Sequence, residues 1–308
     1  MINSTHSVSS SNYCGRFAPS PTGKLHFGSL IAAVGSYLEA KSHNGKWLIR
    51  IENLDKLREI PAASYEILRT IEILGMEWDH EVIYQSHRKD AYENALATLN
   101  KRELTYLCTC TRKEIADSSI TGISGQIYAG TCRYNVQNKD RSGAIRIKTD
   151  NSIIEFKDYL YDSISQRLKS DIGDFILRRS DGIYAYQLAV VVDDAAQGIT
   201  NVVRGADLLD STPRQIYLQK ILGYSTPTYM HLPVAVNNQG KKLSKQTQAA
   251  ILDVSNPVKQ LIEAVRFLGQ EPPIELFENN VSSFWKWAIK NWHPKRIHKE
   301  RTILFPII

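Results

Sequence analysis

The spacing of apolar residues along the first hundred positions predicts strands that alternate with helices. Strands are predicted at residues 13–18 and 47–52, and helices at residues 29–41, 61–75 and 90–101. The first helix is expected to end at Asn44-Gly45, because such a pair is a common helix stop. A strand, a helix and a second strand in this order predict a βαβ unit, the building block of a doubly wound α/β sheet.

The pattern changes between residues 104 and 179, where segments are short and glycines mark turns. We interpret this stretch as an insertion into the first domain. The apolar runs at residues 183–192 and 198–203 are predicted as strands that return the chain to the sheet. The remaining predictions are a helix at residues 212–222, a strand at 232–236, a helix at 256–269 and a small helical region that carries Trp285, Trp287 and Trp292.

The loop between the first strand and the first helix has the composition of a phosphate-binding loop. Its two prolines and a glycine force a tight turn, and His26 comes shortly before the predicted helix. A helix N-terminus offers unpaired amide donors and the positive end of its dipole to a phosphate. This first unit therefore indicates an enzyme that uses a nucleotide.

Composition indicates a globular protein for which RNA is one candidate partner. The 308 residues are enough for one large domain or two ordinary ones, and 43% of them are hydrophobic. No apolar run has the length of a membrane span, and the serine-rich residues 1–12 lack the features of a signal peptide. We therefore expect a disordered tail, a cytoplasmic setting and no membrane contact. The net charge of +6 suits a polyanion such as RNA but does not establish one.

Three of the four cysteines lie close together in the predicted insertion. In a chain without an export signal, disulfides are not expected, so Cys108, Cys110 and Cys132 are candidates for a metal site. Three thiolates satisfy three of the four tetrahedral positions of zinc, and spacing alone leaves the fourth ligand open. The alternative is a set of reduced structural cysteines. Cys14, on the first strand, is expected to be a buried thiol.

Two short motifs resemble the signatures of class I aminoacyl-tRNA synthetases. Leu25-His26-Phe27-Gly28-Ser29 resembles the first signature, and Lys242-Leu-Ser-Lys245 resembles the second. Each match alone is weak, but their order and their places before a helix and after a late strand agree with the family. His26, the helix amides and Lys245 would offset the negative charge that develops during adenylate formation. The alternative is an ordinary loop histidine and a solvated pair of lysines.

Longer matches resemble the glutamyl/glutaminyl branch of these synthetases. They are Arg16-Phe-Ala-Pro-Ser-Pro-Thr-Gly-Lys-Leu-His26, Arg50-Ile-Glu-Asn53, Tyr186, Val203-Arg-Gly-Ala-Asp207 and Lys242-Leu-Ser-Lys-Gln246, within residues 13–250. The resemblance implies an L-glutamate site of Arg16, Phe17, Ala18, Pro19, Ser20, Glu52, Tyr186 and Arg204. It also implies an ATP site of His26, Gly28, Ser29, Lys242 and Lys245, with His26 and Lys245 as the catalytic residues.

The implied glutamate site makes chemical sense for an amino acid with three charges. The guanidinium groups of Arg16 and Arg204 can pair with carboxylates, and Glu52 can receive the α-ammonium group. The family usually has aspartate where this chain has Asn53. Glu52 and Asp55 are both present, so ammonium binding is expected to be intact, whereas a role that needs a charge at position 53 is in doubt. Other polar residues are less informative: Asp193-Asp194 either lines the site or is a solvated strand end, and His43, His80, His87, His231, His293 and His298 are interpreted as surface or packing residues.

The cysteine pattern and the short C-terminal part resemble the glutamyl-queuosine tRNA(Asp) synthetases, paralogues of the glutamyl-tRNA synthetase core. This resemblance implies one structural Zn²⁺ per chain on Cys108, Cys110, Tyr128 and Cys132. Only 63 of the 308 residues follow Lys245, so no anticodon-binding domain is expected. The implied reaction is the activation of glutamate with ATP and Mg²⁺ without tRNA, followed by transfer to queuosine in the anticodon loop of tRNA(Asp).

The expected fold is therefore α/β, a Rossmann-type class I synthetase domain with an inserted zinc-containing α+β subdomain and a small helical C-terminal region. The expected boundaries are a tail at residues 1–12, a catalytic domain at 13–245 with an insertion at about 104–179, and a helical region at 246–308. We expect a monomer. Two other functions stay open: a truncated glutamyl-tRNA synthetase that charges the tRNA 3′ end, and a non-catalytic synthetase-like RNA-binding protein.

Overall fold

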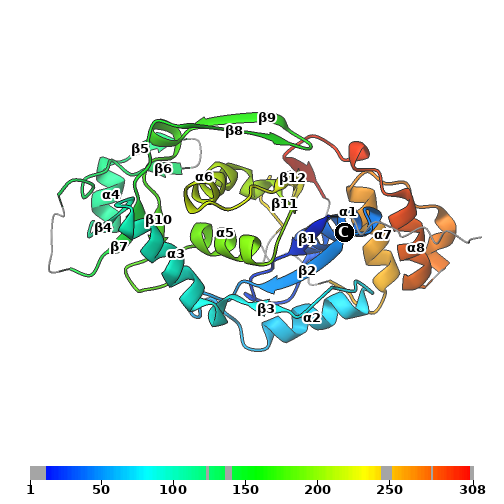
Figure 1. The fold of residues 1–308 in the computed structure, drawn as a ribbon. Coiled ribbons are helices and arrows are strands. Elements are labelled where there is room, and N and C mark those ends of the chain that lie inside the picture. Colours follow the sequence, from blue (N-terminus) through cyan, green and yellow to red (C-terminus); the bar gives the residue numbers. More distant parts are fainter. Residues whose placement is uncertain (1–11, 123–124, 136–140, 244–251, 279, 306–308) are drawn as a thin grey trace, which may run out of the picture.

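A computed structural model describes residues 12–122, 125–135, 141–243, 252–278 and 280–305 (Figure 1). Its helices are α1 Phe27–Ser42, α2 Ala63–Ile73, α3 Lys89–Lys101, α4 Arg112–Ser118, α5 Tyr186–Ala196, α6 Thr212–Leu222, α7 Pro257–Phe267 and α8 Val281–Asn291. Its strands are β1 Cys14–Phe17, β2 Lys46–Ile51, β3 Ile83–Tyr84, β4 Thr105–Cys108, β5 Ile120–Gly122, β6 Gly125–Ile127, β7 Ala144–Ile147, β8 Ile153–Asp158, β9 Asp162–Arg167, β10 Ile176–Arg178, β11 Asn201–Gly205, β12 Thr228–Leu232, β13 Val234–Val236 and β14 Thr302–Leu304.

Parallel strands form the centre of the molecule. β1 pairs with β2 and β2 with β3, while β11 pairs with β12. The two groups meet where the amide of Thr200 donates to the carbonyl oxygen of Cys14 (2.9 Å), so that β11 lies beside β1. Because parallel strands all end at the same edge of a sheet, the loops after β1, β2 and β11 gather there.

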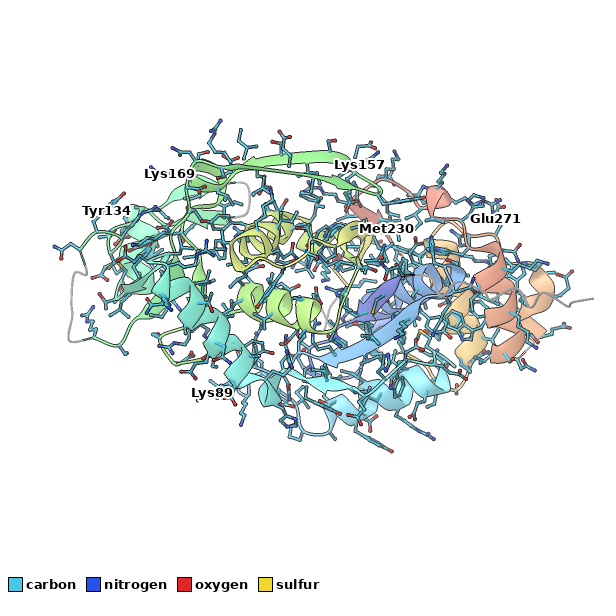
Figure 2. All side chains as sticks on the ribbon, in the orientation of Figure 1. Lys89, Tyr134, Lys157, Lys169, Met230 and Glu271 are labelled. Atoms are coloured by element: carbon cyan, nitrogen blue, oxygen red, sulfur yellow. The ribbon has the colours of Figure 1, made fainter. Side chains whose placement is uncertain are left out.

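Both faces of this sheet are covered by helices. Side chains of a strand alternate between the two faces, and in β2 Trp47 and Ile49 pack in the core beneath α1, whereas Leu48 packs with α3 and α5 on the other face. α1 covers the first face and carries α7 and α8 on its outer side, whereas α3, α5 and α6 lie on the second face (Figure 1). Figure 2 shows Met230 of β12 inside this layered core, while Lys89, Lys157 and Lys169 lie exposed around it. The arrangement is the predicted α/β architecture with helices on both faces.

The prediction of a strand at residues 183–192 is wrong, because Tyr186–Ala196 form helix α5. Residues 188–192 are 0–5% exposed, since α5 lies between the sheet and α3 and α6. A helix that is buried all round reads as a continuous apolar run, which single-sequence periodicity cannot distinguish from a buried strand. As a consequence, Asp193 and Asp194 lie in the last turns of a buried helix and not at a solvated strand end.

The described residues between 104 and 179 include a small antiparallel sheet, β10-β7-β4, with α4 and the β5–β6 hairpin beside it (Figure 1). The β8–β9 hairpin extends from this end of the molecule above α6 (Figure 1). β8 then joins the central sheet, where Asp158 pairs with Tyr229 of β12. The stretch is thus both a separate small sheet and a contributor to the main one.

The C-terminal part packs against α1. The indole nitrogen of Trp292 donates to Glu39 on α1 (2.5 Å), and that of Trp285 donates to the carbonyl oxygen of Leu74 (2.8 Å). The chain then forms β14, a strand that was not predicted, which pairs in parallel with β13. Within the described residues, no helix is both long and apolar enough to cross a membrane.

Candidate active site

One cavity of about 800 Å³ lies at the edge where β1, β2 and β11 end. This volume is within the usual range of small-molecule sites. Every described residue of the expected glutamate and ATP sites lines it: Arg16, Phe17, Ala18, Pro19, Ser20, His26, Gly28, Ser29, Glu52, Tyr186, Arg204 and Lys242. Lys245, the second expected catalytic residue, lies outside the described residues. The structure therefore brings together residues that are up to 226 positions apart, from Arg16 to Lys242.

The first signature forms the start of α1. His26 is the N-cap residue in extended conformation, and its Nδ1 accepts a hydrogen bond from the amide of Ser29 (3.3 Å). Nε2 of His26 lies 3.1 Å from the hydroxyl of Ser29. The helix begins at Phe27, two residues earlier than predicted. Because Gly28 and Ser29 line the cavity, the positive end of the α1 dipole lies at its wall.

The second signature packs directly against the first. A Cβ atom on Gly28 would lie 2.9 Å from the carbonyl oxygen of Leu243, which is too close for any other residue to fit without a shift. The absence of a side chain at Gly28 thus lets the neighbouring loop approach the start of α1. Lys242 pairs with Asp207, which follows β11, so the loop is tied to a second wall of the cavity.

The guanidinium group of Arg16 is fixed by the buried carboxylate of Asp194. Nε and Nη2 of Arg16 donate to the two oxygens of Asp194 (3.2 and 3.3 Å), and Nη1 of Arg50 donates to Asp194 Oδ1 (2.8 Å). Arg50 also donates to Glu52 (3.4 Å). Burial alone would raise the pKa of Asp194, but Arg16 and Arg50 hold it below its usual range. One carboxylate thus positions both an arginine and, through Arg50, the glutamate beside it.

Asp193, the neighbour of Asp194, connects α5 to the segment around α3. Its carboxylate accepts hydrogen bonds from Gln85 (2.8 Å), Arg88 (2.6 Å) and the hydroxyl of Tyr92 (2.8 Å). With three donors and full burial, the Asp193 carboxylate holds α5 to the segment that contains Gln85, Arg88 and Tyr92. The sequence leaves the role of Asp193 open, because only the helical spacing of α5 shows that both aspartates are buried.

Arg204 is fixed by a chain of hydrogen bonds that ends at Asp158. Its Nε donates to Nε2 of His231 (3.0 Å), and Nδ1 of His231 lies 2.6 Å from Asp158 Oδ2. Since an arginine nitrogen only donates, Nε2 must accept, and Nδ1 carries the proton toward Asp158. Nη1 and Nη2 of Arg204 donate to the hydroxyls of Tyr186 (3.3 Å) and Thr212 (2.8 Å).

Burial keeps this histidine neutral. It lowers the pKa of His231 to about 4, although the hydrogen bond to Asp158 acts in the opposite direction. His231 is a packing residue, as expected, but it also orients Arg204. Asp158 was not predicted at all, because it lies in the insertion and no motif marks it.

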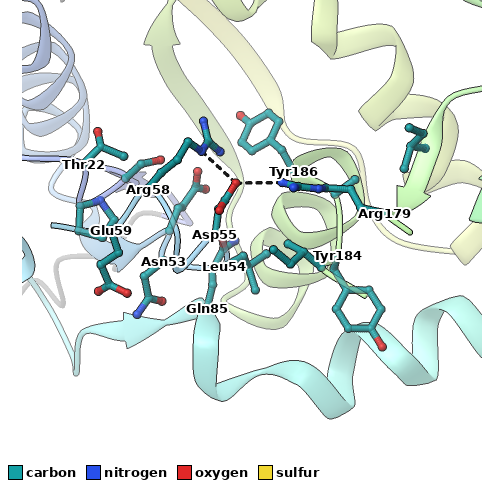
Figure 3. A pocket seen from close by; sticks show the side chains of 16 residues that line it. Thr22, Asn53, Leu54, Asp55, Arg58, Glu59, Gln85, Arg179, Tyr184 and Tyr186 are labelled. Atoms are coloured by element: carbon teal, nitrogen blue, oxygen red, sulfur yellow. Dashed lines mark hydrogen bonds and ion pairs between the residues drawn. The ribbon is translucent and has the colours of Figure 1, made fainter. Parts of the chain in front are cut away.

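A second cavity of about 330 Å³ adjoins the first (Figure 3). Both are lined by the shared residues Ser20, Thr22, Glu52, Arg58 and Tyr186. Asp55 lines only the second cavity, where its Oδ2 accepts hydrogen bonds from Arg58 (3.0 Å) and Arg179 (2.9 Å).

Asn53 has a structural role at the same edge. Its side-chain nitrogen donates to the hydroxyl of Ser86 (3.0 Å), and its side-chain oxygen accepts from the amide of Ser86 (2.9 Å). An aspartate lacks the donor that the first of these bonds requires. The departure from the family pattern at position 53 is therefore matched by a local hydrogen-bonded pair.

The three cysteines and Tyr128 form a compact cluster beside β4. The ligand atoms of Cys108, Cys110 and Cys132 all lie within 4.8 Å of one another, and Cys110 Sγ is 3.4 Å from Cys132 Sγ. The hydroxyl of Tyr128 is 3.3 Å from Cys110 Sγ. A tetrahedral zinc site with Zn–S bonds of about 2.3 Å has sulfur atoms about 3.8 Å apart. The donor set and its spacing therefore fit zinc.

Comparison with known proteins shows similarity over nearly the whole chain. The catalytic domain of tRNA synthetases class I (E and Q) matches residues 14–272. A protein of Dechloromonas aromatica (strain RCB) named glutamyl-Q tRNA(Asp) synthetase is 51% identical over 298 residues, which are 96% of this chain and 99% of the relative. A protein of the same name from Chromobacterium violaceum is 50% identical, over 94% of this chain and 97% of the relative.

Two solved structures are similar to nearly the whole chain as well. A glutamate tRNA ligase from Elizabethkingia meningosepticum, in complex with its amino acid, has a TM-score of 0.76 and 25% identity. The match covers 94% of this chain and 66% of the ligase, so the chain spans about two thirds of that protein. The glutamate-tRNA synthetase of Elizabethkingia anophelis has a TM-score of 0.77, with 95% of this chain and 68% of that one covered.

Proposed function

The chain belongs to the class I tRNA synthetases of the glutamate and glutamine type, and we propose that it activates L-glutamate with ATP and transfers it to queuosine in the anticodon loop of tRNA(Asp). The observation that carries this proposal is the 51% identity to a glutamyl-Q tRNA(Asp) synthetase over nearly the full length of both chains. The gathering of the two signature loops around one cavity supports the catalytic part of it.

L-glutamate binds in the larger cavity beside Arg16, Glu52 and Arg204. Arg16 uses Nε and Nη2 for Asp194, and its Nη1 is proposed to donate to a ligand carboxylate. Arg204 and Tyr186 form a second polar wall, and Glu52 receives the α-ammonium group. Phe17, Ala18, Pro19 and Ser20 complete the site along the chain that follows β1.

ATP binds at the end formed by α1 and the second signature, on His26, Gly28, Ser29, Lys242 and Lys245. In the first step a glutamate carboxylate oxygen attacks the α-phosphorus, and the bond to the pyrophosphate oxygen breaks. His26, the α1 amides and the lysines offset the charge on the phosphates. Mg²⁺ bound with ATP would supply further positive charge there.

The second step passes the glutamyl group to a ring hydroxyl of queuosine. The hydroxyl oxygen attacks the glutamyl carbonyl carbon, an ester bond forms, and the bond to the phosphate oxygen breaks so that AMP leaves with the electron pair. The hydroxyl proton goes to a phosphate oxygen of AMP.

One zinc ion per chain would be held by Cys108, Cys110, Tyr128 and Cys132. Such a site closes the end of the small sheet and has a structural role, because four protein ligands leave no open position. We expect metal analysis of the purified protein to find one zinc per chain in the wild type and in Cys14→Ser, and markedly less in Cys110→Ser. Equal zinc in all three proteins would contradict this assignment.

Labelled glutamate tests the function directly. With ATP and tRNA(Asp), we expect label on queuosine-containing tRNA and none on tRNA that lacks queuosine. Labelling independent of queuosine would favour a truncated glutamyl-tRNA synthetase. Absence of glutamate-dependent ATP–pyrophosphate exchange would favour a non-catalytic RNA-binding protein.

A further inference from the structure

Within the described part of the chain, the second cavity contains a carboxylate oxygen that has no hydrogen-bond partner. Oδ1 of Asp55 is buried and has no hydrogen-bond partner among the residues that the structure describes, while Oδ2 is shared by Arg58 and Arg179. A buried polar atom without a partner costs free energy, and so it often marks a place that a ligand completes. Figure 3 shows Asp55 between the two arginines at this cavity.

The charges around this cavity favour a cationic group over a phosphate. Its lining includes three carboxylates, Glu52, Asp55 and Glu59, but only two guanidinium groups, Arg58 and Arg179. Arg179 is in addition paired with Asp181 (2.5 Å). A phosphate would meet an excess of negative charge there, whereas an ammonium group would meet a carboxylate oxygen that is ready to accept.

The position of the cavity suits the acceptor of the second step. It shares the wall of Ser20, Glu52 and Tyr186 with the larger cavity, in which the activated glutamate is proposed to lie. Its volume of about 330 Å³ is at the lower end for a ligand site and fits one base-sized group. Queuosine carries its ring hydroxyls next to a secondary amine, which is protonated at neutral pH. An acceptor of this kind therefore places a cation close to its nucleophile.

We propose that the second cavity binds the amine-bearing side chain of the acceptor base and that Asp55 Oδ1 accepts a hydrogen bond from its ammonium group. This inference rests on the proposed function and adds a residue that selects the acceptor. Guanosine and a terminal adenosine have no such ammonium group, so neither an unmodified anticodon nor the tRNA 3′ end would offer Asp55 Oδ1 a charged donor.

The test separates the two half-reactions in Asp55→Asn. Asparagine keeps the shape and one oxygen but removes the charge. We expect transfer of glutamate to queuosine-containing tRNA(Asp), measured as kcat/KM for the tRNA, to fall about tenfold or more relative to ATP–pyrophosphate exchange. Asp181→Asn is the matched control, because it removes a carboxylate from the same Arg179 at a position that does not line the cavity. The control should change neither half-reaction.

Three outcomes would overturn the inference. Equal transfer in wild type and Asp55→Asn would show that the charge is not used. A parallel loss of exchange and transfer, or a raised KM for glutamate in exchange, would place Asp55 in the first step or in the fold. A similar loss of transfer in Asp181→Asn would assign the effect to Arg179. Failure of the wild type to label queuosine-containing tRNA would instead contradict the proposed function itself.

Discussion

Arg16 and Arg204 are each held by other buried side chains before any ligand arrives. Asp194 fixes Arg16, and the Asp158–His231 pair fixes Arg204. Fixed donors do not have to reorganise when a charged ligand binds, so they bind it more tightly than mobile ones. This arrangement accounts for two guanidinium groups that are only 3% and 5% exposed and yet line a cavity.

Replacement of Arg16 by lysine tests its proposed contact with glutamate. Lysine keeps the charge but cannot bind Asp194 and a ligand carboxylate together, because it lacks the planar fork of donors. We expect the KM for glutamate in pyrophosphate exchange to rise about tenfold or more, and the KM for ATP to change less than about threefold. Arg69→Lys on the exposed face of α2 is the control. Equal increases in both KM values would contradict a glutamate-specific role.

The buried, neutral state of His231 predicts how the stability of the fold depends on pH. Its pKa of about 4 in the folded protein is below the ordinary 6.5, so the unfolded chain binds the proton first as the pH falls. The contribution of neutral His231 to the free energy of unfolding is therefore fully present above pH 6.5 and is lost as the pH falls toward 4. Between pH 7 and 4 the free energy of unfolding should fall by about 3 kcal/mol more in wild type than in His231→Gln. Urea unfolding at several pH values measures this, and an identical pH dependence would refute the neutral buried state.

Sequence could predict the residues of the site better than the residues that hold them. Arg16, Glu52 and Arg204 stand in strings that carry the family resemblance. Asp158, by contrast, reaches His231 across 73 positions and belongs to the inserted stretch. Partners at such separations are set by tertiary packing, which the local pattern does not contain.

At the scale of elements, the C-terminal strand β14 supports the two signature loops. Its partner β13 leads into the loop of Lys242, and the amide of Phe305 donates to the carbonyl oxygen of Val236 (2.9 Å). The ring of Phe305 stacks on Phe27, the first residue of α1, at 4.0 Å between centroids. β14 and Phe305 thus contact both of the elements that the proposed ATP site requires.

Phe305→Ala should weaken the ATP end of the site. Loss of the stacked ring loosens the start of α1 and the β13 loop together, so we expect the KM for ATP to rise about threefold to tenfold while that for glutamate stays within about twofold. Leu304→Ala is the control, because Leu304 is 57% exposed. Stability of both variants is measured by thermal unfolding. A loss of stability with unchanged KM for ATP would reduce Phe305 to a packing residue.

Elements with a clear apolar periodicity, or with proline and glycine at their ends, could be predicted from the sequence, and the others could not. α6 was predicted with the observed bounds, since proline starts it and Gly223 ends it in a left-handed conformation. α5 was not, because burial on all sides removed its amphipathic pattern. β14 is three residues long and depends wholly on its pairing with β13.

At the scale of the whole molecule, the structure has two adjoining cavities, which suit an enzyme whose two half-reactions use neighbouring sites. The larger cavity is suited to glutamate and ATP, and the second lies across a shared wall formed by residues such as Glu52 and Tyr186. Activation and transfer can then follow one another without movement of the adenylate. The choice of acceptor depends on what enters the second cavity.

The position of glutamate on the tRNA is the decisive test of the proposed function. Queuosine-containing tRNA(Asp) is incubated with the protein, ATP and labelled glutamate, and nuclease digestion then separates the terminal adenosine from the modified anticodon nucleoside. We expect the label on the queuosine nucleoside alone. Label on the terminal adenosine, or equal labelling of tRNA without queuosine, would contradict the proposed function.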